Sequence, residues 1–140
     1  MTPPAYYIPK KYASITEKAA YDNGIPLWLF ARLIDRESKW NAKALRKNRN
    51  GTKDIGIAQF NSAYLSDFVW FDNDGKPFDP WVPAEALPVA ARYVRRLYRA
   101  TKDWKETVMA YNAGLGAVRR GQSPSSTLLH AEIIMGGYKL

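Results

Sequence analysis

The chain has 140 residues, which predicts one domain with one core, and its 46% of hydrophobic residues exclude an intrinsically disordered protein. It contains no cysteine and one histidine, so disulfides and thiolate chemistry are excluded and a transition-metal site is not expected. The formal charge of +8 favours polyanionic partners: nucleic acid, anionic lipid and the acidic polymers of a bacterial cell wall all satisfy that condition.

The N-terminal region predicts an arm followed by a helix. Residues 1–13 contain three prolines and are expected to form an irregular arm lying on a domain that covers residues 14–140. Ser14-Ile15-Thr16-Glu17 has the sequence of a capping box, which predicts that the first helix begins there and ends at Gly24.

Pro26 is expected to open a second helix. The apolar residues of this helix follow the i, i+3, i+4, i+7 spacing of a buried face: Leu27, Phe30, Ala31 and Ile34. Glu37 lies three residues beyond Ile34 on the same side. A carboxylate therefore occupies a position at which the pattern predicts an apolar residue.

The rest of the chain predicts a mainly α fold. Turn-forming residues predict at most a small β-excursion around residues 48–58. Further helices are expected over residues 62–68, 83–101, 103–114 and 125–135, with a loop at 71–81 and a turn at 117–120. Pro88 is expected to bend the long helix or reset its start. Asp103 with Glu106 is expected to cap the helix that follows.

Glu37 suits the cleavage of a glycosidic bond. Such cleavage needs a carboxylic acid that holds its proton at neutral pH, which a partly apolar pocket allows because desolvation disfavours the charged form. Apolar residues adjacent in sequence are expected to supply that pocket: Leu33, Ile34 and Trp40. The alternative is a solvated helix-end glutamate paired with Arg36 or Lys39.

Two later motifs offer polar and aromatic groups that suit a sugar. Gly56-Ile57-Ala58-Gln59 places a glycine where backbone can approach a ligand and an amide that both donates and accepts. Ala110-Tyr111-Asn112-Ala113-Gly114 places an aromatic ring beside another amide. Taken separately, each motif is equally consistent with ordinary packing.

The sequence resembles the lytic transglycosylase family, whose fold is lysozyme-like. The resemblance lies in two segments that occur in this order along the chain: ESKWNAKALRKNRNGTKDIGIAQFNSAYL and AYNAG. The resemblance is closest to the compact branch found in secretion, conjugation and phage cell-wall-penetrating systems. In that family a Glu-Ser pair is followed by G-[LI]-x-Q-[IF]-N and then by AYNAG. The match runs from about Pro26 to Gly121.

This resemblance implies a set of site residues. Glu37 would be the sole catalytic acid and base. The residues implied to contact substrate or shape its site are Ser38, Gln59, Asn61, Tyr111, Asn112 and His130. His130 stands where many members carry a tyrosine in the closing helix, and a buried packing or hydrogen-bonding role is an equal alternative for it. The family pattern has methionine at the position of Ala58, so the resemblance also implies a looser cleft wall here, for which Phe60, in place of the usual isoleucine, would compensate.

The resemblance implies cleavage of the β-1,4 bond between N-acetylmuramic acid and N-acetylglucosamine in peptidoglycan, without a cofactor or a metal. Glu37 would protonate the bridging oxygen. As a carboxylate it would then take a proton from the muramoyl 6-hydroxyl, which closes a 1,6-anhydro ring.

Two other functions remain open. Asp54 precedes the Gly56 motif and would suit a hydrolytic muramidase, which uses two carboxylates, although a role in stabilising the adjacent turn explains it as well. A non-catalytic, wall-binding or structural subunit of a phage or secretion assembly would also keep the fold. Nucleic-acid binding is not expected, because no recognised motif accompanies the aromatic and basic residues.

Several other features predict ordinary roles. Asp72-Asn73-Asp74-Gly75 predicts a turn rather than a calcium loop, because Lys76 stands where a ligand would be needed. Arginines at helical spacing predict a solvated basic stripe, or a surface for wall polymers or a partner protein: Arg92, Arg95, Arg96 and Arg99.

No signal peptide or membrane span is visible in the sequence. We therefore expect a protein that acts on the bacterial cell wall in the periplasm after delivery in or by a phage particle. Export by a secretion apparatus is the alternative route, and other proteins of such a particle or apparatus are the expected partners.

Overall fold

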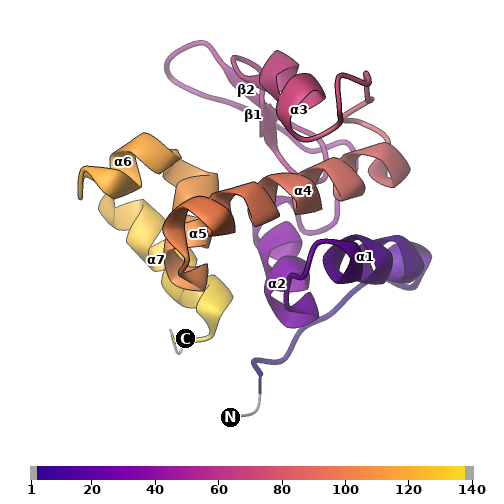
Figure 1. Ribbon diagram of the computed structural model, residues 1–140, viewed down its shortest axis with the longest axis horizontal. Helices are drawn as coiled ribbons and strands as arrows, with labels where there is room; N and C mark the ends of the chain where they lie inside the picture. The colour runs from indigo at the N-terminus through magenta and orange to yellow at the C-terminus, as the bar shows by residue number, and fades with distance from the viewer. Residues whose placement is uncertain (1–2, 138–140) are drawn as a thin grey trace.

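The computed structural model describes residues 3–137 and confirms a mainly helical domain with one small sheet. In chain order the elements are α1 (Lys10–Asp22), α2 (Leu27–Ser38), β1 (Leu45–Lys47), β2 (Lys53–Ile55), β3 (Phe60–Asn61), α3 (Leu65–Phe71), α4 (Pro83–Thr101), α5 (Trp104–Ala113), α6 (Leu115–Arg119) and α7 (Ser125–Met135). In Figure 1, α4 crosses the middle of the molecule, with α1 and α2 below its right half and α5 to α7 around its left end. The sheet and α3 lie together above α4.

The core is formed mainly by α2 and α4, whose apolar faces are closed to solvent. On α2 the fully buried residues are Leu29, Phe30, Ala31, Leu33 and Ile34. On α4 they include Ala86, Leu87, Ala90 and Val94. The observed face of α2 agrees with the predicted spacing at three of four positions, since Leu27 is only partly buried.

The capping box predicted at Ser14 is wrong. The first helix, α1, begins at Lys10 after Pro9, no side chain caps it, and residues 10–13 are helical rather than irregular. Pro9 immediately precedes the helix, with φ of −54°. Because proline has no backbone N–H, this residue leaves no donor that a side chain would have to satisfy. The amide of Tyr12 donates to the Pro9 carbonyl at 2.9 Å, which closes the first turn.

The helix that carries Glu37 ends abruptly. Pro26 precedes it as the N-cap rather than as its first residue. After Ser38, Lys39 and Trp40 both take left-handed backbone conformations, with φ of 51° and 62°. Two such residues in succession turn the chain away at once, so Glu37 and Ser38 lie in the last turn of α2.

The β-region is wider than the predicted residues 48–58. The sheet has the order β1-β2-β3 and is antiparallel throughout, starting at Leu45 and ending at Asn61. Its register pairs Arg46 with Asp54 and Asp54 with Asn61, so these three positions are neighbours across the strands. The missed strands are three and two residues long, too short to give a period-2 pattern.

A glycine is required where β2 leaves the sheet. Gly56 has φ of 78°, and a Cβ placed there would lie 2.1 Å from the carbonyl oxygen of Pro80. Both the backbone conformation and the space exclude a side chain. The first residue of the GIAQ motif is therefore set by contact with the segment between α3 and α4.

The remaining helices agree with prediction to different degrees. The long helix and the last helix have the predicted bounds, and Asp103 caps α5 by accepting from the Glu106 amide at 2.9 Å. Pro88 lies inside α4 and does not reset its start. Two predictions are wrong: α3 runs from 65 to 71 instead of 62 to 68, and the turn predicted at 117–120 belongs largely to α6.

Arg32 joins three segments that are distant in sequence. From α2 its guanidinium donates to the carbonyls of Ile134 and Ile133 at the end of α7, each at 2.7 Å, and also to the carbonyl of Ala5 in the N-terminal arm. The final carbonyls of a helix lack intrahelical partners, so Arg32 completes the end of α7. None of the helices described is both long and apolar enough to cross a bilayer.

Candidate active site

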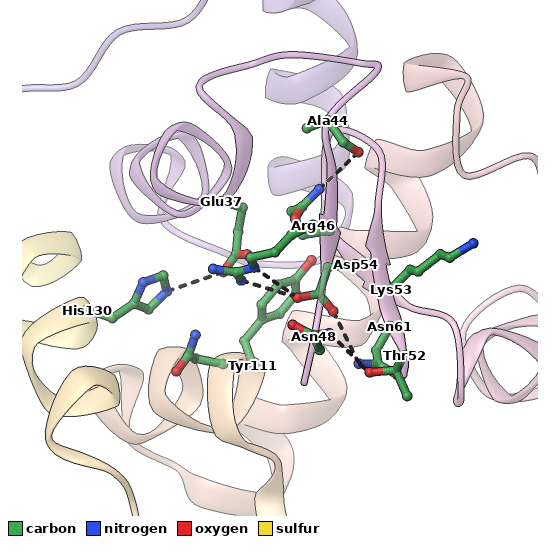
Figure 2. A network of polar contacts seen from close by, with 12 residues as sticks. Glu37, Ala44, Arg46, Asn48, Thr52, Lys53, Asp54, Asn61, Tyr111 and His130 are labelled. Atoms are coloured by element: carbon green, nitrogen blue, oxygen red, sulfur yellow. Dashed lines mark hydrogen bonds and ion pairs between the residues drawn. The ribbon is translucent and has the colours of Figure 1, made fainter. Parts of the chain in front are cut away.

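Glu37 is shielded from solvent and faces a histidine. Its side chain is 5% exposed, and its Oε1 atom lies 3.3 Å from Nε2 of His130, whose side chain is 10% exposed. Figure 2 shows the two side chains approaching from α2 and α7. The alternative in which Glu37 pairs with Arg36 or Lys39 is not seen, because no ion pair to either residue occurs within residues 3–137.

Tyr111 lies beside this pair and is fixed by its hydroxyl. The hydroxyl donates to the carbonyl of Ala58 at 2.6 Å. This bond ties α5 to the loop formed by Gly56-Ile57-Ala58-Gln59, the GIAQ loop. Burial raises the pKa of Tyr111 well above its ordinary value of 10.0, and the nearby carboxylates, Glu37 first, raise it further. The hydroxyl therefore stays a hydrogen-bond donor throughout the working pH range.

Ser38 fastens the end of α2 to the same loop. Its Oγ donates to the carbonyl of Ile57 at 2.6 Å, with the carbonyl of Ile34 more distant at 3.4 Å. The hydroxyl proton is thus used within the protein. Ser38 positions the turn that carries Glu37 and does not offer this proton to a ligand.

Gln59 closes the loop on itself. It adopts a left-handed backbone with φ of 56°. Its side-chain Nε2 donates to the Gly56 carbonyl at 2.9 Å and to the Ala44 carbonyl at 3.2 Å. Three successive carbonyls of the loop, from Gly56 to Ala58, therefore accept hydrogen bonds from side chains that belong to three different segments.

Asp54 is held from two sides. One oxygen is 3.2 Å from the Arg46 guanidinium, and the other accepts from Asn61 at 3.2 Å (Figure 2). The Asp54 side chain is 13% exposed, and Asn61 also donates to the hydroxyl of Thr52. Arg46 was not predicted; its register opposite Asp54 becomes evident only once the strands are aligned.

A cavity of about 350 Å³ lies beside Tyr111. It is lined by Gln59, Phe60, Asn61, Tyr64, Phe68, Tyr93, Ala110, Tyr111, Asn112, Ala113 and Gly114. Four predicted residues are thus brought to one cavity, while Glu37, Ser38 and His130 are not among its lining. Tyr111 connects the two groups, because it lines the cavity and lies beside the Glu37 carboxylate.

Several residues that line the cavity were not predicted from the sequence. Tyr64, Phe68 and Tyr93 supply aromatic rings, and Tyr93 packs edge-on against Phe68 at 4.7 Å between centroids. Burial, followed by the charge of Asp72, raises the pKa of Tyr93 to about 12. The available signal was helical spacing, since Tyr93 falls three residues after Ala90 on the buried face of α4.

The GIAQ loop packs against the core. Ala58 is fully buried, and the expectation of a looser cleft wall at this position stays a prediction. Phe60 is 2% exposed and packs edge-on against Phe68 and Phe78, with centroids 4.9 and 5.2 Å away. Asn112, which also lines the cavity, accepts from the Thr127 hydroxyl at 2.6 Å and thereby links α5 to α7.

The segment around Asp72 forms the predicted turn. Asp72 is 4% exposed, and burial raises its pKa from 3.8 to about 6 against the opposing effect of Arg96 and Arg92. Arg92 donates to the Asp72 carbonyl and to Asn73, and Arg96 lies over a neighbouring aromatic ring. Half of the predicted arginine stripe is thus engaged with this turn rather than simply solvated. Across the described part of the chain, no group of three or more acidic or histidine side chains could hold a metal.

Comparison with known proteins gives a family match. A family model described as the transglycosylase SLT domain matches residues 14–134. The fold is similar to that of the lytic transglycosylase Slt of Pseudomonas aeruginosa, solved as an inactive glutamate-to-glutamine mutant. The TM-score is 0.76 at 16% identity, over 90% of this chain and 23% of that one.

Two further proteins are similar. For the 70 kDa soluble lytic transglycosylase of Escherichia coli, the TM-score is 0.66 at 20% identity, over 89% of this chain and 22% of that one. Lysozyme c-1 of Anopheles gambiae is 39% identical over 64 residues, which is 42% of this chain and 44% of that protein. The chain thus spans less than a quarter of each transglycosylase and less than half of the lysozyme. At these identities the solved structures confirm the lysozyme-like fold.

Proposed function

Because the chain belongs to the transglycosylase SLT domain family, we propose that it is a peptidoglycan lytic transglycosylase in which Glu37 alone serves as acid and base. The observation that carries this proposal is the position of Glu37. Its carboxyl group is almost closed to solvent, lies at a helix end and has Tyr111 as its neighbour. The inactive Slt mutant, in which one glutamate is replaced by glutamine, supports a mechanism in which one glutamate is indispensable.

The reaction needs two proton transfers through one group. Glu37 first donates its proton to the oxygen that bridges N-acetylmuramic acid and N-acetylglucosamine, and the bond to the muramoyl carbon breaks. The Glu37 carboxylate then accepts the proton of the muramoyl 6-hydroxyl, whose oxygen bonds to the same carbon. The product carries a 1,6-anhydro ring, and Glu37 is again protonated without any net uptake of water.

The surrounding residues divide into those that hold the site and those that meet the sugar. Ser38 anchors the turn of Glu37 through the Ile57 carbonyl. Tyr111, with Gln59, Asn61 and Asn112, faces the cavity in which a neighbouring sugar unit would bind. An aromatic ring beside amide groups matches the apolar face and hydroxyl rim of a sugar.

Hydrolysis is the alternative on the same scaffold, and the similarity to a lysozyme over 64 residues favours considering it. A hydrolase would need a second carboxylate to activate water or to stabilise the sugar cation. Asp54 is the candidate, but both of its oxygens already have partners in Arg46 and Asn61. Asp54 is therefore assigned a structural role, in which it links the strands of the sheet.

The setting follows from the proposed chemistry. A protein that cuts glycan strands acts on the cell wall, and its net charge of +8 suits the acidic wall polymers. Carriage in a phage particle, or export by a secretion apparatus, would place it there. A non-catalytic wall-binding subunit would keep the fold but would not need a shielded Glu37.

The test is the chemical nature of the products. Purified peptidoglycan is digested with the wild-type protein, and the released muropeptides are identified by mass spectrometry. We expect 1,6-anhydro-muramoyl ends, which are lighter by one water than hydrolytic products. Glu37→Gln should abolish their release while the circular dichroism spectrum is unchanged, whereas Asp35→Asn, an exposed neighbour on the same helix, should retain it. Reducing muramoyl ends from the wild type would replace the proposal with hydrolysis.

A further inference from the structure

The contact between α2 and α7 contains two polar atoms that have only each other. Oε1 of Glu37 and Nε2 of His130 are both sealed from solvent, and neither has a hydrogen-bond partner elsewhere in the described chain. They lie 3.3 Å apart and come from residues 93 positions distant in sequence. Leaving two buried polar atoms unpaired is unfavourable, so a proton shared between them is the arrangement that satisfies both.

We propose that His130 is a positioning residue, which donates a hydrogen bond from Nε2–H to Oε1 of Glu37 and leaves Oε2 to give and take the catalytic proton. This inference rests on the proposed function of Glu37. It replaces the expectation that His130 contacts substrate, because His130 is 10% exposed and does not line the cavity.

The donor has to be the histidine for the chemistry to work. Since Oε1 has no access to solvent, a substrate can reach only Oε2, and the acid proton must therefore sit on Oε2 before cleavage. Oε1 is then an acceptor in the acid form and remains one in the carboxylate form. A neutral imidazole with its hydrogen on Nε2 can donate in both forms, so its own proton does not move during the reaction.

Among the described residues, two other polar groups near Glu37 are already engaged elsewhere. The hydroxyl of Tyr111 is committed to the Ala58 carbonyl. The guanidinium of Arg46 is committed to Asp54, and its distance to the Glu37 carboxylate exceeds that of an ion pair. Arg32 fixes α2 against the end of α7 through the backbone, which keeps the Glu37 and His130 side chains opposite one another.

Kinetics distinguishes positioning from substrate contact. We would measure kcat and KM on soluble, uncross-linked glycan strands for His130→Leu, which has no donor, and for His130→Gln, whose amide N–H can donate. The bond is made to a group that becomes charged, so its loss should lower kcat by about 10- to 100-fold in His130→Leu. KM should stay unchanged, and His130→Gln should recover part of the rate. Leu129→Gln, an exposed change one residue away, is the matched control.

Three kinetic outcomes would overturn the inference. An unchanged kcat in His130→Leu would remove the histidine from the mechanism. A raised KM with wild-type kcat would make it a substrate contact. A kcat in His130→Gln as low as that in folded His130→Leu would show that the donor is not what matters.

A second readout needs no activity, because His130 is the only histidine in the chain. In a ¹⁵N-labelled protein the imidazole nitrogens give one pair of signals, which report the tautomer directly. We expect an Nε2–H tautomer in the wild type and a changed Nε2 shift in Glu37→Leu, with Asp35→Asn as the control. Equal shifts in the wild type and a folded Glu37→Leu would refute the pairing.

The two experiments separate the possible failures. If the wild type released no anhydro-muropeptides, the proposed function would fail, while the nitrogen shifts would still decide whether Glu37 and His130 are partners. If both His130 variants lost their fold, the nitrogen shifts alone would decide. If the products were as expected but the histidine signals ignored Glu37, the proposed function would stand and the positioning role would not.

Discussion

The hydroxyl of Ser38 and the carbonyl of Ile57 are joined by a 2.6 Å hydrogen bond that links the last turn of α2 to the GIAQ loop. Because Ile57 is fully buried, removal of the hydroxyl leaves its carbonyl without this donor. The turn that carries Glu37 would also lose its attachment. Two consequences, one for stability and one for catalysis, are therefore expected from a single oxygen atom.

Ser38→Ala should lower the free energy of unfolding by about 1–2 kcal/mol, the usual effect of leaving a buried polar group unpaired. It should also reduce kcat more than KM, since the Glu37 carboxyl group becomes less well fixed. Urea unfolding and glycan-strand kinetics measure these two effects. Ser66→Ala, an exposed change in α3, is the control, and equal stability of the two variants would contradict the assigned role of Ser38.

Gly56→Ala should be strongly destabilising, by about 3 kcal/mol or more, because it combines a strained backbone with a steric clash. The φ of 78° disfavours any side chain, and the added Cβ would lie 2.1 Å from the Pro80 carbonyl. Gly51→Ala is a matched control, since Gly51 has φ of 87° but no atom within 4 Å of the added Cβ. It should lose only about 1 kcal/mol, the contribution of the backbone alone. Similar losses in thermal unfolding would show that the Pro80 contact is unimportant.

Arg32→Met should destabilise the domain by about 2–4 kcal/mol, because it removes charge-assisted hydrogen bonds to the end of α7 and to the arm. Methionine keeps most of the apolar stem, so the loss reports the guanidinium. Arg36→Met, an exposed change one turn later, should alter stability by less than about 0.5 kcal/mol. Hydrogen exchange offers a local measurement, and unaltered protection of α7 amides in Arg32→Met would refute the linkage.

Asp72→Asn should make the protein more stable at neutral pH but not in acid. Burial raises the pKa of Asp72 from 3.8 to about 6, so the folded state favours the protonated carboxyl group. Its contribution to stability is full below the ordinary pKa of 3.8 and is lost as the pH rises through about 6.

Asparagine keeps the neutral shape at every pH. Asp72→Asn should therefore match the wild type at about pH 3 and exceed it by about 3 kcal/mol at about pH 8, on the basis of 1.36 kcal/mol per pKa unit. Urea unfolding at the two pH values provides the measurement. Asp35→Asn controls for the loss of one exposed negative charge. A stability gain that did not depend on pH would refute the assignment to Asp72.

Local sequence signals predicted the helices well where the deciding contact is itself local. The Asp103 cap is an example, because its partner is the amide of Glu106, three residues away. The same reasoning failed at Ser14, because Pro9, five residues earlier, had already allowed the helix to begin. A capping sequence shows that a helix can start at a position but cannot exclude an earlier start.

The arrangement of the site was less accessible from sequence. The motifs identified Glu37 and Tyr111, yet the partner of each is fixed by the packing of distant elements. His130 meets Glu37 because α7 lies against α2, and Arg46 meets Asp54 because of strand register. These contacts depend on tertiary geometry, which the spacing of residues along one helix or strand does not encode.

The hydrogen bonds that Gly56, Ile57 and Ala58 accept do not depend on the side chains of these three residues. The accepting carbonyls belong to the main chain, which is the same whatever the side chain. This explains how alanine can stand at position 58 where the family pattern has methionine. Side chains behind this loop can therefore change in size while its backbone carbonyls still accept from Ser38, Gln59 and Tyr111.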